Sequence, residues 1–224
     1  MSANLISLLW DATLQTLYMV AVSAILGTVG GLPLGVFLAT SQRGELLSAP
    51  WINKVLGLVV NATRSVPFII LVVAIIPFTR ALVGTSIGTN AAIVPLTLAA
   101  IPFIARLVEN AIREVDGGLI EAARAMGATP LQIIRKVLIP EAMPAIALGL
   151  TLAVVSLIGY SAMVGAVGGE GLGDLGIRYG YQRFMPEVML AVVVILIVLV
   201  QLVQSLGEWI AARVDRRAPR NRGH

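Results

Sequence analysis

Residues 116–140, DGGLIEAARAMGATPLQIIRKVLIP, form the one long polar segment in a chain that is otherwise strongly apolar. The first half of this segment has the residues that begin and end a short helix. Asp116 with Gly117 can begin the helix, and Gly127 can end it because glycine accepts the left-handed backbone conformation found at helix C-termini. Residues 121–124, Glu-Ala-Ala-Arg, would lie inside this helix.

The second half of the segment predicts another short helix. Thr129 is a suitable N-cap, Pro130 suits the first helical position, and Gln132 is placed to reach back as in a capping box. Pro140 is expected to end this helix, because proline has no backbone N–H to donate. Residues 116–140 therefore predict a helix–turn–helix loop between two membrane spans.

The spacing of this loop resembles the EAA loop of the ABC importer permease family. The resemblance rests on Glu121-Ala122-Ala123, on Gly127, and on the ending Val-Leu-Ile-Pro at residues 137–140. It implies a cytoplasmic loop whose first helix docks in a cleft of a separate ATPase subunit. The alternative is an ordinary amphipathic loop helix with solvated charges. The coupling residues implied by the resemblance are Leu119, Ile120, Glu121, Ala122, Ala123, Met126, Gly127 and Ala128.

Composition places the chain in a membrane. Of its 224 residues 58% are hydrophobic and 12% are charged, whereas soluble domains carry about 25% charged residues. There is no cysteine, and the single histidine is the last residue, His224. We therefore expect one all-α integral membrane domain over residues 1–224, with no metal site and no cofactor bound by this chain.

Five apolar segments are long enough to cross a bilayer, since a spanning helix needs about 20 residues. With the loop at residues 116–140 between the third and fourth, the expected spans are residues 12–40, 56–79, 91–112, 142–165 and 187–212. The glycine-rich residues 165–176 are expected to form an outward loop, with a loop that dips back into the membrane as the alternative.

Small residues and prolines mark the first three spans. Gly27, Gly31 and Gly35 recur every fourth residue, which places them on one helical face and favours close packing against another helix. Pro33 is expected to kink or soften that first helix. In the second span prolines stand at positions 67 and 77, and in the third at positions 95 and 102, where breaks in helical bonding are expected.

Arg64 is the one charge inside the second span. An arginine there is expected to lie near the membrane surface or to face a wet interior. Its position can reflect snorkelling alone, or a role in binding an anion. The sequence leaves both readings open.

The distribution of basic residues predicts the orientation. With the 116–140 loop inside, three basic residues fall outside: Arg80, Arg178 and Arg183. Thirteen fall inside: Arg43, Lys54, Arg64, Arg106, Arg113, Arg124, Arg135, Lys136, Arg213, Arg216, Arg217, Arg220 and Arg222. The positive-inside rule then predicts the N-terminus outside and the C-terminus in the cytoplasm.

The chain lacks the motifs of a self-powered pump. Neither of its two lysines, Lys54 and Lys136, completes a Gly-Lys-Ser/Thr phosphate loop, so we expect no ATP hydrolysis by this chain. Proton-coupled carriers need ionisable residues inside their spans, and the uncharged parts of the expected spans contain none. Five spans are few to enclose a pathway, so a two-fold homodimer is expected.

A longer run of matches resembles the permeases of methionine uptake systems. It comprises RSVPFIILVVAIIPFTR from residue 64, VGTSIG, AAIVPLT, PFIAR, VENA, LIEAARAMGATP and GYSAM. The resemblance implies import of L-methionine, with D-methionine and derivatives as further candidates, across the bacterial inner membrane. It also implies two ABC ATPase subunits that bind ATP and Mg, an extracytoplasmic substrate-binding protein and no nucleic acid.

The same resemblance implies that Met163 closes the pathway, with Tyr160 and Ser161 beside it. Packing inside the helical bundle is the alternative for Met163. Three other functions stay open at this point. They are an ABC permease for another small solute such as a polar amino acid or osmoprotectant, an ion-coupled carrier or channel, and a non-transporting assembly subunit.

Overall fold

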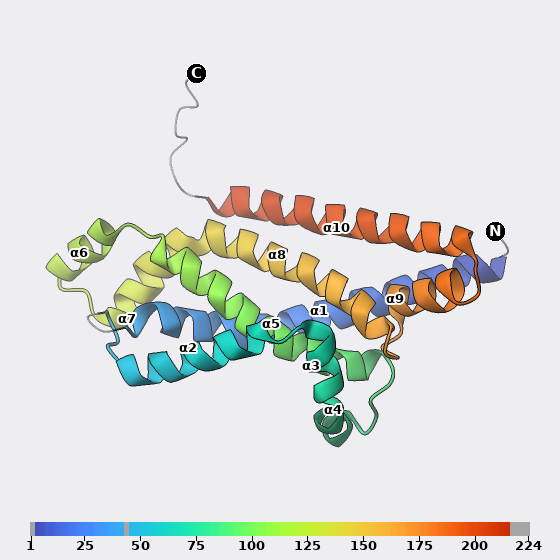
Figure 1. Cartoon of the computed structure of the whole chain (residues 1–224). Helices are drawn as coiled ribbons and strands as arrows, with labels where there is room; N and C mark the ends of the chain where they lie inside the picture. Colours follow the sequence, from blue (N-terminus) through green and yellow to red (C-terminus); the bar gives the residue numbers. More distant parts are fainter. Residues whose placement is uncertain (1–2, 43–44, 216–224) are drawn as a thin grey trace.

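The computed structural model describes residues 3–42 and 45–215, and every regular element in these residues is helical (Figure 1). Four helices are long and apolar enough to cross a membrane. They are α1 (Ala3–Thr40), α5 (Thr89–Arg113), α8 (Ile139–Gly165) and α10 (Pro186–Val214). The all-α membrane fold expected from the sequence is confirmed.

The centre of the bundle is the contact between α1 and α5, and α8 packs between α5 and α10. Gly27, Gly31 and Gly35 lie on the α1 face that meets α5, as their spacing predicted. A β-carbon added to Gly27 would stand 2.6 Å from the β-carbon of Ala100, so only glycine allows this approach. Helix α1 continues through Pro33, and α5 continues through both of its prolines, where the sequence predicted breaks.

The second expected span, residues 56–79, is not one helix. The structure has α2 (Pro50–Ser65), α3 (Phe68–Ala74) and α4 (Ile76–Val83), with a 101° bend between α2 and α3. Val66 is extended (φ −80°, ψ 126°) because the ring of Pro67 disfavours helical backbone in the residue before it. The described residues therefore contain four candidate spans, or five if the bent pair counts as one.

The loop between α5 and α8 has the two helices that its sequence predicts. Helix α6 (Gly117–Ala125) begins at Asp116, whose side chain accepts a hydrogen bond from the Gly118 backbone N–H. Gly127 then takes the left-handed conformation, with φ 79°. Helix α7 (Pro130–Ile133) begins with the predicted capping box between Thr129 and Gln132.

The prediction that Pro140 ends the second helix of the loop is wrong. After α7 the chain forms a π-helical turn, η1 (Ile134–Leu138), and continues directly into α8. The Ile139 N–H bonds to the Ile134 carbonyl, five residues back, so the turn is wider than in an α-helix. Pro140 follows directly after this wide turn, so its missing N–H falls where the regular α-helical bonding is already interrupted.

The glycine-rich segment after α8 is also more regular than expected. Within and just after the segment expected to be an outward loop the chain forms α9 (Gly171–Leu175) and a second π-helical turn, η2 (Gly176–Tyr181), which pack against α1 and α10. The Gly171 N–H donates to the Gln15 side chain at 3.1 Å, and the Leu172 N–H donates to the Thr16 hydroxyl at 2.9 Å. These bonds fasten the turn to the N-terminal half of α1.

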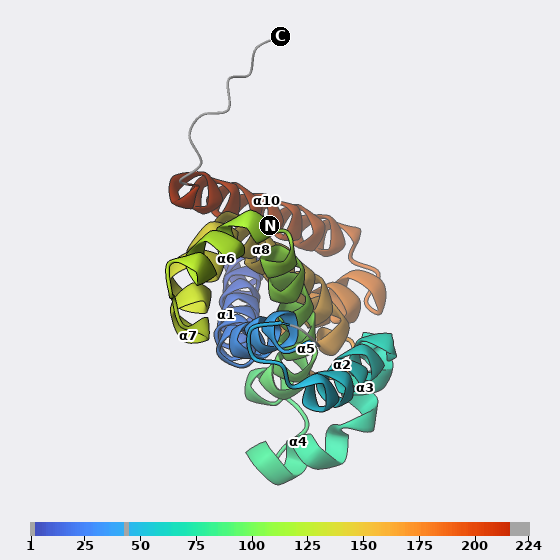
Figure 2. The ribbon, with the colours of Figure 1, turned by 90° about the vertical axis from the view of Figure 1, so that its left-hand side faces the viewer.

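The elements are distributed over two ends of an elongated bundle (Figures 1 and 2). Helices α6 and α7 lie at one end together with the C-terminal end of α10, and the start of α1 lies with α9 at the opposite end. The expected basic residues Arg43, Arg216, Arg217, Arg220 and Arg222, and also His224, lie outside the described residues.

Candidate functional site

Helix α6 is attached to the bundle by one face and exposes the other. Ala123 is buried, and Ile120 and Ala128 pack against the same core. The other five expected coupling residues are exposed: Leu119, Glu121, Ala122, Met126 and Gly127. The eight expected residues therefore divide into three that hold the helix in place and five that are free to meet a partner.

The exposed face of α6 is small and amphipathic. Met126 is 81% exposed and Leu119 is 43% exposed, with the carboxylate of Glu121 between them in sequence. Methionine adapts its shape to varied surfaces, and exposed apolar side chains rimmed by charge are typical of protein–protein contacts. Ala123 keeps the inner face flat enough for α6 to lie close to the bundle.

A buried carboxylate at the end of α5 was not recognised from the sequence. Glu109 is only 3% exposed and pairs at 2.5 Å with both Arg106 and Arg113, one turn before and one turn after it. Arg106 also donates to the Gly57 carbonyl at 3.2 Å and to the Asn61 side chain at 2.9 Å. This ion triad ties α2 to the end of α5 that leads into α6.

The spacing of the triad could have indicated it. Arginines three residues before and four residues after a glutamate lie on the same face of a helix as that glutamate. What the sequence could not give is the burial of Glu109, which depends on α2 packing beside α5.

The three residues expected along the pathway do not share one face of α8. Tyr160 and Met163 are one turn apart, and Met163 is 42% exposed. Ser161 is buried, and its hydroxyl donates to the Ile158 carbonyl at 2.7 Å, so it faces the interior of the chain. The ring of Tyr160 stacks on Phe68 of α3 with the ring centroids 4.4 Å apart. Only Tyr160 and Met163 are placed to meet a solute at this face.

A small cavity of about 150 Å³ opens beside Tyr160, where α2, α3, α5 and α8 meet. Arg64 and Thr63 of α2 line one part of it, and Phe68 and Phe103 line another. The Arg64 guanidinium lies 6.0 Å from the centre of the Phe103 ring. The cavity thus combines one cation with an aromatic wall.

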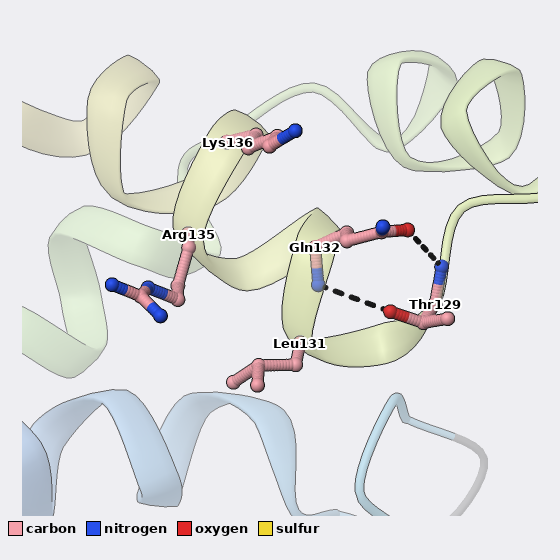
Figure 3. A pocket seen from close by; sticks show the side chains of 5 residues that line it. All are labelled: Thr129, Leu131, Gln132, Arg135 and Lys136. Carbon is pink, nitrogen blue, oxygen red and sulfur yellow. Dashed lines mark hydrogen bonds between the residues drawn. The ribbon is translucent and has the colours of Figure 1, made fainter.

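A larger hollow of about 550 Å³ lies on the loop, along α7 and η1 (Figure 3). It is lined by Thr129, Leu131, Gln132, Arg135 and Lys136. Figure 3 shows Arg135 and Lys136 pointing in different directions, while Thr129 and Gln132 are engaged with each other in the capping box. The two cations do not converge on one point, so this hollow is a surface depression of the loop and not a built anion site.

Within the part of the chain that the structure describes, no three His, Cys, Asp or Glu side chains gather closely enough to hold a metal ion.

A helical membrane bundle with an exposed amphipathic helix on one end places the protein in the class of polytopic membrane proteins. Residues 31–217 match the family model described as "Binding-protein-dependent transport system inner membrane component", and the chain belongs to this family. The family thus matches most of the described bundle, including α6.

Relatives of known name cover almost the whole chain. A probable D-methionine transport system permease protein of Vibrio cholerae is 58% identical over 94% of this chain and 93% of its own length. The D-methionine transport system permease protein of Escherichia coli K12 is 53% identical over 74% of this chain and 76% of its own.

Solved structures agree with the sequence relatives. A chain of the MetNI methionine ABC transporter, in an inward-facing conformation, superposes with a TM-score of 0.94 at 51% identity, covering 96% of this chain and 100% of that one. A chain of an amino acid ABC transporter solved with histidines has a TM-score of 0.77 at 21% identity, over 95% of this chain and 100% of that one. The second likeness shows a shared fold alone.

Proposed function

We propose that this chain is the membrane permease of an ATP-driven importer that takes up methionine. The observation that carries the proposal is the likeness, over nearly the full length of both chains, to permeases named for methionine transport and to a methionine transporter structure. L-methionine is the primary substrate on this proposal. D-methionine is included because it stands in the names of the relatives, and methionine derivatives are further candidates.

The direct test is uptake by the reconstituted system. The chain is purified with its ATPase and binding protein, placed in liposomes, and supplied with labelled L-methionine and a panel of unlabelled amino acids and osmoprotectants. Competition by L- and D-methionine and by few other solutes supports the proposal. Competition by a polar amino acid or an osmoprotectant instead, or transport by the chain without the ATPase, contradicts it.

The exposed face of α6 is proposed as the surface that docks into the ATPase subunit. Its support is the amphipathic pattern around Met126 and Leu119 and the fixed attachment of α6 through Ala123. The ion triad of Glu109 joins α2 to the end of α5 that leads into α6. A force applied to α6 would therefore also move α2. Closure of two ATPase subunits on ATP would thereby reorient the pathway by rigid-body motion.

Two copies of the chain are proposed to form the pathway between them, with two ATPases in the cytoplasm and a binding protein outside. Each chain would cross the membrane five times, with α2 and α3 forming one broken crossing. The placement of the two described chain ends at opposite ends of the bundle fits an odd number of crossings.

Topology can be tested cleanly, because the chain has no cysteine of its own. In single-cysteine variants, Met126→Cys on α6 should react only with reagent applied from the cytoplasmic side. Ile87→Cys, in the exposed turn before α5, should react only from the outside. Labelling of position 126 from the outside would reverse the proposed orientation.

A further inference from the structure

Arg64 lies at the bend between α2 and α3. It belongs to the last turn of α2, one residue before the helix ends, and the chain then turns by 101° into α3. This position brings its side chain to the cavity between α2, α3, α5 and α8. Arg64 is thus part of a built concave site and not of a smooth helix surface.

The guanidinium of Arg64 has no anionic partner among the described residues. No carboxylate or hydrogen-bond acceptor in these residues pairs with it, and it lies over the ring of Phe103, 6.0 Å from the ring centre. Arg106 and Arg113 share Glu109, and Arg80 donates to the Ser86 hydroxyl at 3.1 Å, whereas Arg183 and Arg213, like Arg64, lie over an aromatic ring. Arg64 differs from those two in lining the cavity beside Tyr160. Arg64 is an exposed residue that also lines the cavity, so its guanidinium is available to an anionic ligand there.

The remaining lining sets the chemistry that fits beside the charge. Phe68 and Tyr160 stack into one aromatic wall, and Phe103 provides a second ring near the arginine. The Tyr160 hydroxyl takes part in no hydrogen bond with the described residues, so it is free to donate. A guanidinium fork binds a carboxylate bidentately, and aromatic rings attract a thioether sulfur. The cavity therefore suits a carboxylate joined to an apolar or sulfur-containing chain.

We propose that Arg64 holds the carboxylate of the transported amino acid during its passage, while Phe68, Phe103 and Tyr160 contact the amino acid's side chain. The inference rests on the proposed function, since it takes methionine as the transported solute. Tyr160 is one turn from Met163 on α8, so the solute would be held next to the residue expected to close the pathway.

The lining also indicates which part of the solute is not recognised. No acidic side chain lines the cavity, so the ammonium group of an amino acid would find no ion-pair partner there. At this site, a derivative with a blocked amine should therefore be accepted, and a derivative with a blocked carboxylate should be rejected.

The first test compares solute moved per ATP hydrolysed in liposomes that contain the complete transporter and a saturating amount of loaded binding protein. Arg64→Gln should lower the methionine transported per ATP by roughly tenfold or more, the loss expected for a charged hydrogen bond. Its ATPase activity should still respond to the binding protein, because α6 is unchanged. Arg64→Lys should recover part of the loss, since it keeps the charge without the fork.

The matched control is Arg80→Gln, which removes an arginine from α4 outside the cavity and should leave the ratio unchanged. A wild-type ratio in Arg64→Gln would overturn the inference, and so would an equal fall in Arg64→Gln and Arg80→Gln. Methionine uptake by the wild type separates the two proposals. Without it the proposed function fails, whereas uptake with an unaffected Arg64→Gln removes only the role of Arg64.

A second measurement decides the matter should Arg64→Gln fail to assemble. Labelled methionine is bound, without binding protein, to the wild-type permease–ATPase complex and to the Arg64→Lys complex. The difference between the two amounts is the bound fraction that depends on Arg64. N-acetylmethionine should displace that fraction and methioninamide should not. Displacement by methioninamide alone, or the absence of any fraction sensitive to Arg64, would overturn the inference.

Discussion

Gly31 of α1 packs directly against the backbone of Ile101 in α5: a β-carbon added to Gly31 would stand 2.8 Å from the Ile101 carbonyl oxygen. It would also stand 2.8 Å from the β-carbon of Ile104. Both neighbours belong to a rigid helix and cannot move aside singly. The contact between the two central helices thus depends on the absence of a side chain at this position.

Gly31→Ala should therefore destabilise the bundle by about 1–3 kcal/mol, the cost of overpacking a close-packed contact. The measurement is the thermal unfolding midpoint in detergent. Gly30→Ala is the control, because its nearest neighbours are side-chain atoms of Ile101 at 3.1 Å and beyond, which can shift. Equal losses in the two variants would show that backbone contact is not the cause.

The ion triad around Glu109 should be a major contributor to stability. Glu109→Ala leaves Arg106 and Arg113 without their shared carboxylate. Because these arginines are 22% and 44% exposed, the expected loss is about 1.5–3 kcal/mol, below that of a fully buried pair. Because Arg106 also bridges to α2, chymotryptic cleavage near residues 50–65 should increase in the same variant. The control, Asp174→Asn, removes the more exposed ion pair with Arg178 and should cost less than about 1 kcal/mol. Similar stability of Glu109→Ala and wild type would contradict the prediction.

Changing the charge of exposed residues on α6 and its C-terminal cap should separate permease from ATPase. Glu121→Lys and Met126→Glu each change an exposed side chain, so the permease should reach the membrane in normal amounts. Copurification of the ATPase and methionine uptake should both fall by at least an order of magnitude, since an interface centre tolerates a misplaced charge poorly.

The control for this pair is Glu187→Lys, the same charge change on an exposed residue at the start of α10. The start of α10 lies at the opposite end of the bundle from α6 (Figure 1). The variant should keep its ATPase. Normal uptake in Glu121→Lys and Met126→Glu together would remove α6 as the docking element.

Met163→Ala should make the pathway leak. Removing the thioether chain from the exposed face of α8 widens any constriction formed by two such side chains across a dimer. Methionine efflux from loaded liposomes without ATP should then rise several-fold. Leu152→Ala, which shortens another exposed side chain of α8, is the control and should not leak. A tight Met163→Ala would assign the residue to packing.

Local sequence signals determined the helices that depend on near neighbours. The capping box at Thr129 and Gln132, the turn at Gly127 and the start of α6 at Asp116 all form as their residue types predict, because each involves bonds within a few positions. The apolar segments likewise specify spanning helices through their own hydrophobicity. The glycine repeat in α1 predicted a close contact because helical periodicity alone places those residues on one face.

Only the tertiary structure decided which residues pack against these helix faces. The partner of the glycines, the burial of Glu109 and the wall formed by Phe68 and Tyr160 each join residues far apart in sequence. Pro140 shows the same limit: a π-helical turn lets the chain continue where the proline predicted an end. The sequence shows which residues lack a backbone N–H. Whether the chain then bends, as at Pro67, or stays helical, as at Pro140, depends on the packing that surrounds it.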